Sequence, residues 1–327
     1  MILSEDAYKE VFGLFRPGQR VAICGHINPD GDAIGSAVAL SIFLKGIGCR
    51  VTKLLAAESC PPELYAFLPD YQFMAAADYQ QRPDIFVAVD LSQADRLGKA
   101  KRLIEEAGQT VVIDHHLGYD GFADHALSAP GAAAAGLLVW ELIEASGRPV
   151  GKDIATACYV ALMTDTGRFA YQNTDAQVLA TAARMVEAGA DPAALYSHVY
   201  EMRPEGSVKL DARLIDRMDY LDDQQQVVCS WVDLSDFSEL GVARDDTEGL
   251  PSLLRSLKGV EIAILLRCEP DGVRVNLRSK NSYDVGELAN HFGGGGHAGA
   301  AGFTFAGGLE SVREAIAAHL RTQGFSV

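Results

Sequence analysis

Histidines and aspartates gather in four short segments of the first half of the chain, in a pattern that suits a metal centre. The segments are GHINPDGDAIGS (25–36) with His26, Asp30 and Asp32, VAVD ending at Asp90, IDHH with Asp114, His115 and His116, and TDTGRF (164–169) with Asp165. Carboxylates and imidazoles without thiolates suit Mn²⁺ or Mg²⁺. Each segment alone has a simpler explanation, such as a helix cap for Asp32 or a turn residue for Asp165. Together they predict one divalent metal centre.

Two ions fit this centre better than one, because four of its members are carboxylates. In one pocket these aspartates would repel one another and raise one another's pKa values. Two divalent ions would balance the four negative charges. A calcium-binding hairpin is a poor alternative for NPDGDA. Ala33 stands where that hairpin requires glycine, and Ala39 stands where it requires glutamate.

The first half of the chain alternates between apolar runs rich in Val and Ile and segments with a helical pattern. Strands are expected over 20–26, 49–57, 83–91 and 109–116, and helices over 33–46 and 95–107. Such alternation is typical of a mostly parallel sheet covered by helices on both faces. Three of the four segments follow expected strands, and parallel sheets bind ligands at the carboxyl ends of their strands. The segments are therefore expected to meet at that edge.

The second half is first helical and then returns to strands. Helices are expected over 131–146, 151–164, 174–189, 191–202 and 205–219, and strands over 225–234, 260–269 and 272–280, with a hairpin turn at PDG (270–272). The expected fold class is α/β. An N-terminal, mostly parallel sheet flanked by helices would cover 1–190, and a helical linker 191–220. A smaller C-terminal α/β domain would cover 221–327, with the active site in the cleft between the domains.

Composition argues against several classes of protein. The 327 residues carry a formal net charge of −16, which is poorly suited to a long nucleic-acid duplex, whose binding depends on Lys and Arg contacts to phosphate. No signal peptide is expected, and the apolar stretch 131–145 is too short and too acidic to cross a membrane. Six cysteines without a CxxC pair favour reduced thiols in a cytoplasmic protein.

The four segments, in their order, resemble the motifs of the DHH phosphoesterase family, and GGGGHAGAAGF (293–303) resembles the glycine-rich motif of the DHH-associated domain. A chain with this pair of domains is most similar to the nano-RNase/pAp phosphatase group. That resemblance implies hydrolysis of short oligoribonucleotides such as pApA and removal of a phosphate from pAp, adenosine 3′,5′-bisphosphate. It also implies two Mn²⁺ ions as cofactors, with Mg²⁺ as the alternative.

The resemblance also implies a role for each motif residue. One ion would be held by His26, Asp30 and Asp90, and the other by Asp32, Asp90, His115 and Asp165. Asp90 would then bridge the two ions. His116 would face the scissile phosphate as a catalytic residue, and Asp114 would orient the ligands.

The second domain is expected to bind the substrate. Backbone N–H groups of Gly294, Gly295 and Gly296 could cradle an anion, because no Cβ stands in the way. His297 could add a hydrogen-bond donor, and Arg278 could donate two parallel hydrogen bonds to a phosphate. Ser279 is a weaker candidate for phosphate binding. Arg168 and Phe169 lie close to the metal motifs but are given no role. Lys280 and His291 are likewise left unassigned, and Tyr171 is expected to pack rather than to stack on a base.

Substrate length follows from charge. A long single strand needs an extended basic track, whereas about two to five nucleotides need only the metal ions and one phosphate clamp. Three alternatives stay open. One is a two-metal inorganic pyrophosphatase, the second is a phosphodiesterase acting on pApA, and the third is a non-catalytic nucleotide-binding sensor. The sequence leaves open the preferred substrate, the cleavage polarity and pairing into a homodimer through an apolar helix face at 131–146.

Overall fold

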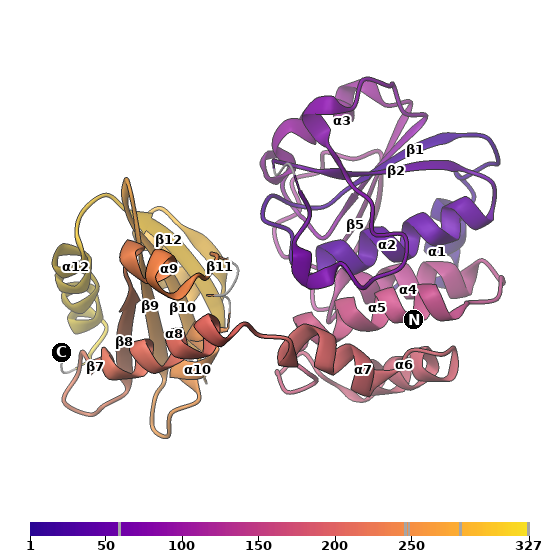
Figure 1. The fold of residues 1–327 in the computed structure, drawn as a ribbon. Helices are drawn as coiled ribbons and strands as arrows, with labels where there is room; N and C mark the ends of the chain where they lie inside the picture. The colour runs from indigo at the N-terminus through magenta and orange to yellow at the C-terminus, as the bar shows by residue number, and fades with distance from the viewer. Residues whose placement is uncertain (58–59, 245–246, 248, 281–282, 326–327) are drawn as a thin grey trace. The chain divides into compact units, whose positions relative to one another are not determined.

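The computed structural model describes residues 1–57, 60–244, 247, 249–280 and 283–325. The chain divides into two compact units, Met1–Met202 and Arg203–Val327, shown as ribbons in Figure 1. The segment expected as a linker, 191–220, is helical on both sides of this division. In the described part of the chain, none of the helices combines the length and the apolar composition needed to cross a membrane.

The N-terminal unit is built on a parallel sheet of six strands in the order β3-β2-β1-β4-β5-β6. The strands are β1 Arg20–Cys24, β2 Arg50–Leu55, β3 Met74–Ala75, β4 Ile85–Val89, β5 Gln109–Asp114 and β6 His125–Ser128. The parallel sheet and four of its strands were predicted. The short strands β3 and β6 carry too little apolar pattern to be recognised from sequence.

Both faces of this sheet are covered, as alternation along each strand requires. In β1, Val21 and Ile23 join the larger core, while Ala22 and Cys24 join the smaller one. The larger core is closed by α-helices. These are α1 Glu5–Phe12, α2 Gly31–Gly46, α4 Ala135–Ala145, α5 Lys152–Asp165, α6 Ala176–Glu187 and α7 Pro192–Tyr196, which continues as a π-helical turn, Ser197–Glu201.

The smaller core is covered by a segment that was expected to be one helix over 95–107. This expectation is wrong, because the chain forms a 3₁₀ segment, Ala94–Arg102, followed by the single turn α3, Leu103–Glu106. Gly98 breaks the segment with φ of 50°, and a Cβ there would lie 2.7 Å from the carbonyl oxygen of Ala56. Two further 3₁₀ turns, Glu63–Tyr65 and Ala76–Asp78, complete the unit.

Helices α2, α4 and α5 pack closely enough to require glycine at their contacts. A Cβ on Gly35 would lie 2.5 Å from the carbonyl oxygen of Ala157, and one on Gly136 would lie 2.4 Å from Cβ of Ala161. Helix α4 is buried over most of its length, with Trp140 only 2% exposed. Burial within the unit, rather than a free face for a second copy, therefore accounts for its apolar sequence.

The C-terminal unit holds a mixed sheet in the order β11-β12-β10-β9-β8-β7, in which only the β8–β9 pair of the described strands is parallel. Its strands are β7 Asp219–Tyr220, β8 Val227–Val232, β9 Ile262–Glu269, β10 Gly272–Ser279, β11 Gly295–His297 and β12 Ala300–Phe305. Its helices are α8 Glu205–Asp216, α9 Leu234–Leu240, α10 Leu250–Arg255, α11 Val285–His291 and α12 Leu309–Thr322. The predicted hairpin at 270–272 is confirmed, since Glu269 pairs with Gly272.

Replacing Gly35 with alanine should destabilise the protein, because the new methyl group would meet backbone at 2.5 Å and force α2 and α5 apart. We expect a loss of about 1–3 kcal/mol in the free energy of unfolding, measured by urea denaturation. Gly46→Ala is the matched control in the same helix, where a Cβ has no neighbour within 4 Å. That variant should be neutral or more stable by up to about 1 kcal/mol. Equal stability of the two variants would contradict the packing argument.

Candidate metal centre

The carboxyl edge of the N-terminal sheet brings the predicted metal ligands together. His26 follows β1, Asp90 follows β4, and His115 and His116 follow β5, so three adjacent strands deliver side chains to one place. Three further candidate ligands come from helices: Asp30 is the N-cap of α2, Asp32 lies in the first turn of α2, and Asp165 ends α5. The predicted convergence of these segments is thus present in the structure.

Asp90 lies at the middle of the cluster and faces a different imidazole with each oxygen. Its Oδ2 is 3.4 Å from Nε2 of His26, and its Oδ1 is 3.4 Å from Nε2 of His115. Oδ1 also lies 3.6 Å from Nδ1 of His116. The residue is 2% exposed, and among the described residues Oδ1 has no well-formed hydrogen bond. A buried carboxylate oxygen that lacks a well-formed hydrogen bond is suited to binding a cation.

The other candidate ligands form two groups, and an imidazole of each group faces one oxygen of Asp90. In one, Nε2 of His26 lies 3.8 Å from Oδ2 of Asp30. In the other, Nε2 of His115 lies 3.7 Å from Oδ2 of Asp32 and 3.6 Å from Oδ2 of Asp165. At octahedral bond lengths of about 2.1 Å, donors that share an ion stand about 3.0 Å apart when adjacent and about 4.2 Å apart when opposite. The separations fall in this range.

Each imidazole is oriented by the nitrogen that does not face the cluster. Nδ1 of His26 lies 2.8 Å from the carbonyl oxygen of Ile27, and Nδ1 of His115 lies 3.0 Å from that of Ala132. A carbonyl can only accept a hydrogen bond, so Nδ1 carries the proton in each ring and Nε2 is left to bind metal. His116 is held differently, with its Nδ1 2.7 Å from Oδ1 of the fully buried Asp114.

The two aspartates of α2 are fixed by backbone amides. Oδ1 of Asp30 accepts hydrogen bonds from the N–H groups of Asp32 and Ala33 at 3.0 and 3.1 Å, which leaves Oδ2 facing His26. Asp32 accepts from the N–H of Ala135 at 2.6 Å and of Gly136 at 2.8 Å. These amides open helix α4, whose positive dipole end stabilises an anion. Sequence reasoning missed them, because they lie about a hundred residues from Asp32.

The pKa values show that the cluster retains protons, which offset its crowded negative charge. Burial, together with Asp90 and Asp165, raises the pKa of Asp32, and burial raises the pKa of Asp165 to about 7. Burial disfavours the charged imidazoles, but facing carboxylates outweigh it and raise the pKa of His26 to about 10 and of His115 to about 11. Although burial opposes it, those imidazoles hold the pKa of Asp90 well below its usual range. Divalent cations are the natural replacement for these protons.

The predicted substrate residues of the C-terminal unit lie at one end of its sheet. Ala300 of β12 pairs with Arg278 of β10 on one side and with His297 of β11 on the other. Ser279 is 4% exposed and its hydroxyl donates to the carbonyl oxygen of Ala298 at 2.9 Å, so it is already used within the unit. Nη1 of Arg278 donates to the carbonyl oxygen of Leu277 at 3.0 Å.

The glycine run has a structural explanation of its own. Residues Gly295–His297 form strand β11 rather than an open loop. A Cβ on Gly294 would lie 2.3 Å from the carbonyl oxygen of Gly302, and one on Gly296 would lie 2.5 Å from that of Ala300. Gly295 has more space, since only Oδ1 of Asn290 would lie near its Cβ, at 3.7 Å. Close pairing of β11 with β12 therefore requires glycine at 294 and 296, whatever else the run does.

Both the sequence and the fold are similar to those of known proteins. Residues 20–162 match the DHH family, N-terminal domain, and residues 224–322 match the DHHA1 domain. The bifunctional oligoribonuclease and PAP phosphatase NrnA of Thermus thermophilus is 28% identical over 93% of this chain and 91% of its own length. The protein of the same name from Bacillus subtilis is 23% identical over 83% and 85%. An exopolyphosphatase-related protein from Bacteroides fragilis shares the fold, with a TM-score of 0.91 and 24% identity over 98% of each chain.

Replacing Asp90 with asparagine should weaken metal binding at both ligand groups, because one oxygen of Asp90 faces His26 of the first group and the other faces His115 of the second. Asparagine is chosen since Asp90 has φ of 61°, which Asn tolerates better than alanine does. Titration of Mn²⁺ into EDTA-treated protein, followed by calorimetry, should show two ions for the natural chain. The variant should lose at least about tenfold in affinity at each site.

The matched control is Asp95→Asn, since the Asp95 side chain is 88% exposed and pairs only with Lys101 among the described residues. It should bind two ions as the natural chain does. Unchanged binding by D90N, with its fold intact by circular dichroism, would contradict the central position assigned to Asp90.

Proposed function

Because the chain joins a DHH family N-terminal domain to a DHHA1 domain it belongs to the DHH family, and we propose that it hydrolyses short oligoribonucleotides and pAp with two Mn²⁺ ions. The observation that carries this proposal is Asp90, a buried carboxylate that offers one oxygen to each of two ligand groups. The two relatives named as oligoribonuclease and PAP phosphatase span nearly the same length, which supports the same substrate class.

His26, Asp30 and Asp90 would hold one ion, and Asp32, Asp90, His115 and Asp165 would hold the other. Ions in these places would make a water molecule more acidic and neutralise charge on the phosphoryl oxygens during in-line displacement. We propose Mn²⁺ over Mg²⁺ because imidazole nitrogen contributes to both groups, and Mg²⁺ prefers oxygen.

His116 is proposed to act on the phosphate itself. Its Nδ1 is held by Asp114 at 2.7 Å, which directs Nε2 away from that carboxylate. Asp114 is fully buried, so the ring has a fixed orientation. From there His116 can donate a proton to the leaving oxygen as the bond between that oxygen and phosphorus breaks.

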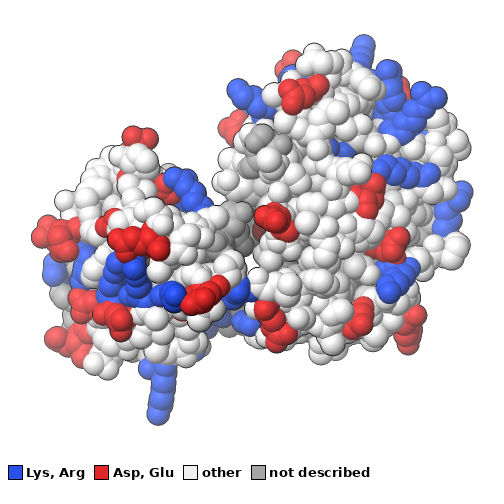
Figure 2. All heavy atoms as spheres, in the orientation of Figure 1, with Lys and Arg blue, Asp and Glu red and all other residues white. Residues whose placement is uncertain are grey.

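The C-terminal unit is proposed to bind the rest of the substrate. Arg278 offers a guanidinium for a phosphate. His297 stands across β12 from it, and the open backbone at Gly295 lies two residues before His297 on β11. Lys and Arg side chains are interspersed with Asp and Glu on both units in Figure 2. Together with the net charge of −16, this favours short single-stranded substrates over a long duplex.

The function is tested by a substrate panel assayed with Mn²⁺ after EDTA treatment. We expect hydrolysis of pAp, of pApA and of 5′-phosphorylated oligoribonucleotides up to about five residues, declining toward decamers. D90N should be inactive on all of them, and D95N should match the natural chain. Pyrophosphate as the best substrate would favour a family pyrophosphatase instead. No hydrolysis of any substrate would indicate a binding module.

Replacing Arg278 with alanine should reduce the preference for pApA over bis(p-nitrophenyl) phosphate, because the smaller substrate carries no nucleotide for the C-terminal unit to bind. The expected change in the ratio of the two kcat/KM values is about tenfold, the typical effect of a hydrogen bond to a charged group. The change should arise mainly from KM for pApA. Equal losses on both substrates would show that Arg278 acts through the fold and not on the substrate.

A further inference from the structure

The turn that follows Asp165 has an unusual backbone. Gly167, Arg168 and Phe169 all have positive φ, at 53°, 65° and 61°. This region is unfavourable for residues with a Cβ and persists where surrounding contacts enforce it, often at functional sites. Here the N–H of Arg168 donates to the carbonyl oxygen of Met163 at 2.8 Å, and that of Phe169 donates to Oγ1 of Thr166 at 3.1 Å.

The turn sends two adjacent side chains to different surroundings. Phe169 packs against the larger core, with its ring centre 5.6 Å from that of Tyr159. Arg168 is exposed, only three residues after Asp165. The phenylalanine thus anchors a backbone conformation in which the arginine, three residues after Asp165, is exposed.

The guanidinium of Arg168 lies over an aromatic ring. Its central carbon lies 5.0 Å from the ring centre of Tyr200, within the π-helical turn Ser197–Glu201. Such turns often occur at functional sites. Over the described residues, Arg168 forms no ion pair with Asp or Glu, whereas Arg184 of the same unit pairs with Glu144 at 2.9 Å. A guanidinium that rests on an aromatic ring keeps its N–H edge for an anion.

We propose that Arg168 binds the 5′-terminal phosphate of the substrate, the one that is not attacked. This inference rests on the proposed function. In pAp and in pApA alike, the attacked phosphorus is attached to the 3′ oxygen of a nucleotide that also carries a 5′ phosphate. A single cation held on the turn that follows Asp165 can therefore serve both substrates. Tyr200 is a positioning residue, because it acts through Arg168.

The test compares pApA with ApA, the same dinucleotide without the 5′ phosphate. The natural chain should prefer pApA, and Arg168→Gln should lower the ratio of the two kcat/KM values by about tenfold, mainly through KM for pApA. Arg168→Lys, which keeps the charge but not the planar fork, should recover part of the ratio. The lost contact should also weaken the salt dependence of KM for pApA.

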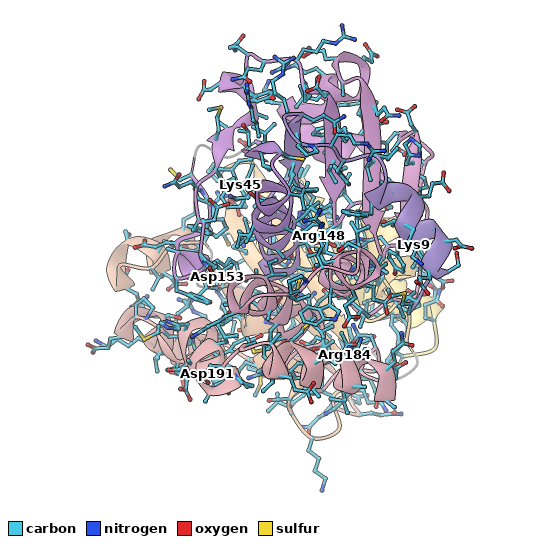
Figure 3. All side chains as sticks on the ribbon, turned by 90° about the vertical axis from the view of Figure 1, so that its right-hand side faces the viewer. Lys9, Lys45, Arg148, Asp153, Arg184 and Asp191 are labelled. Atoms are coloured by element: carbon cyan, nitrogen blue, oxygen red, sulfur yellow. The ribbon has the colours of Figure 1, made fainter. Side chains whose placement is uncertain are left out.

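The matched control is Arg148→Gln. Arg148 is exposed and follows α4 at the end opposite Ala135 and the metal centre, and the helix is 11 residues, or about 16 Å, long. Figure 3 faces this far end of the helices, where Lys45, Arg148 and Asp153 are labelled. R148Q should keep the natural ratio. An equal fall in both variants would mean that general electrostatics, and not a phosphate contact, sets the preference.

Tyr200 provides a second test that a merely structural role would not pass. Tyr200→Leu should lower the pApA to ApA ratio in the natural chain but have no further effect in R168Q, because the two residues act as one unit. Additive effects would overturn the positioning role. A natural ratio near one, or an unchanged ratio in R168Q, would overturn the inference while the proposed function stands. Failure to hydrolyse either dinucleotide would instead remove the proposed function.

Discussion

Strand order in the parallel sheet is the constraint on which the metal centre depends. Because β4 lies between β1 and β5, the residue that follows it, Asp90, necessarily stands between His26 and His115. A buried carboxylate is costly unless positive charge compensates it. Imidazolium or metal on both sides provides that compensation, so a central acid with a flanking imidazole on each side follows from the order β1-β4-β5.

Helix packing fixes the ligands that the sheet does not supply. Asp32 on α2 is held by the first amides of α4, and Asp165 stands at the end of α5. The mutual position of these ligands is therefore only as precise as the contacts of α2 with α4 and α5. Glycine at positions 35 and 136 lets the helices approach until there is no space for a Cβ. Close packing of this kind resists small displacements, which a metal centre with narrow distance limits requires.

The sequence predicted the edge of the sheet well, because a run of Val and Ile that ends in Asp or His is visible locally. It could not predict that the first amides of α4 donate hydrogen bonds to Asp32, since nothing near Ala135 and Gly136 indicates a partner a hundred residues away. It also gave no sign that Arg168 and Phe169 adopt left-handed backbone, since that conformation is imposed by Met163 and Thr166 after folding. Four glycines suggested an open anion cradle, yet Gly294 and Gly296 are required by the pairing of β11 with β12.

Several candidate ligands use one side-chain atom for a structural hydrogen bond and another to face the cluster. This division explains how so many charged side chains can lie together within a folded unit. Asp30 caps α2 with one oxygen and faces His26 with the other. His26 and His115 each use Nδ1 for a backbone carbonyl and Nε2 for the cluster. In these three residues, the bonds that set orientation use other atoms than those that would bind metal. Facing carboxylates raise the pKa values of both imidazoles, so these rings retain protons that offset part of the negative charge of the cluster. Cations entering it would exchange with protons in a site whose geometry the fold has already set.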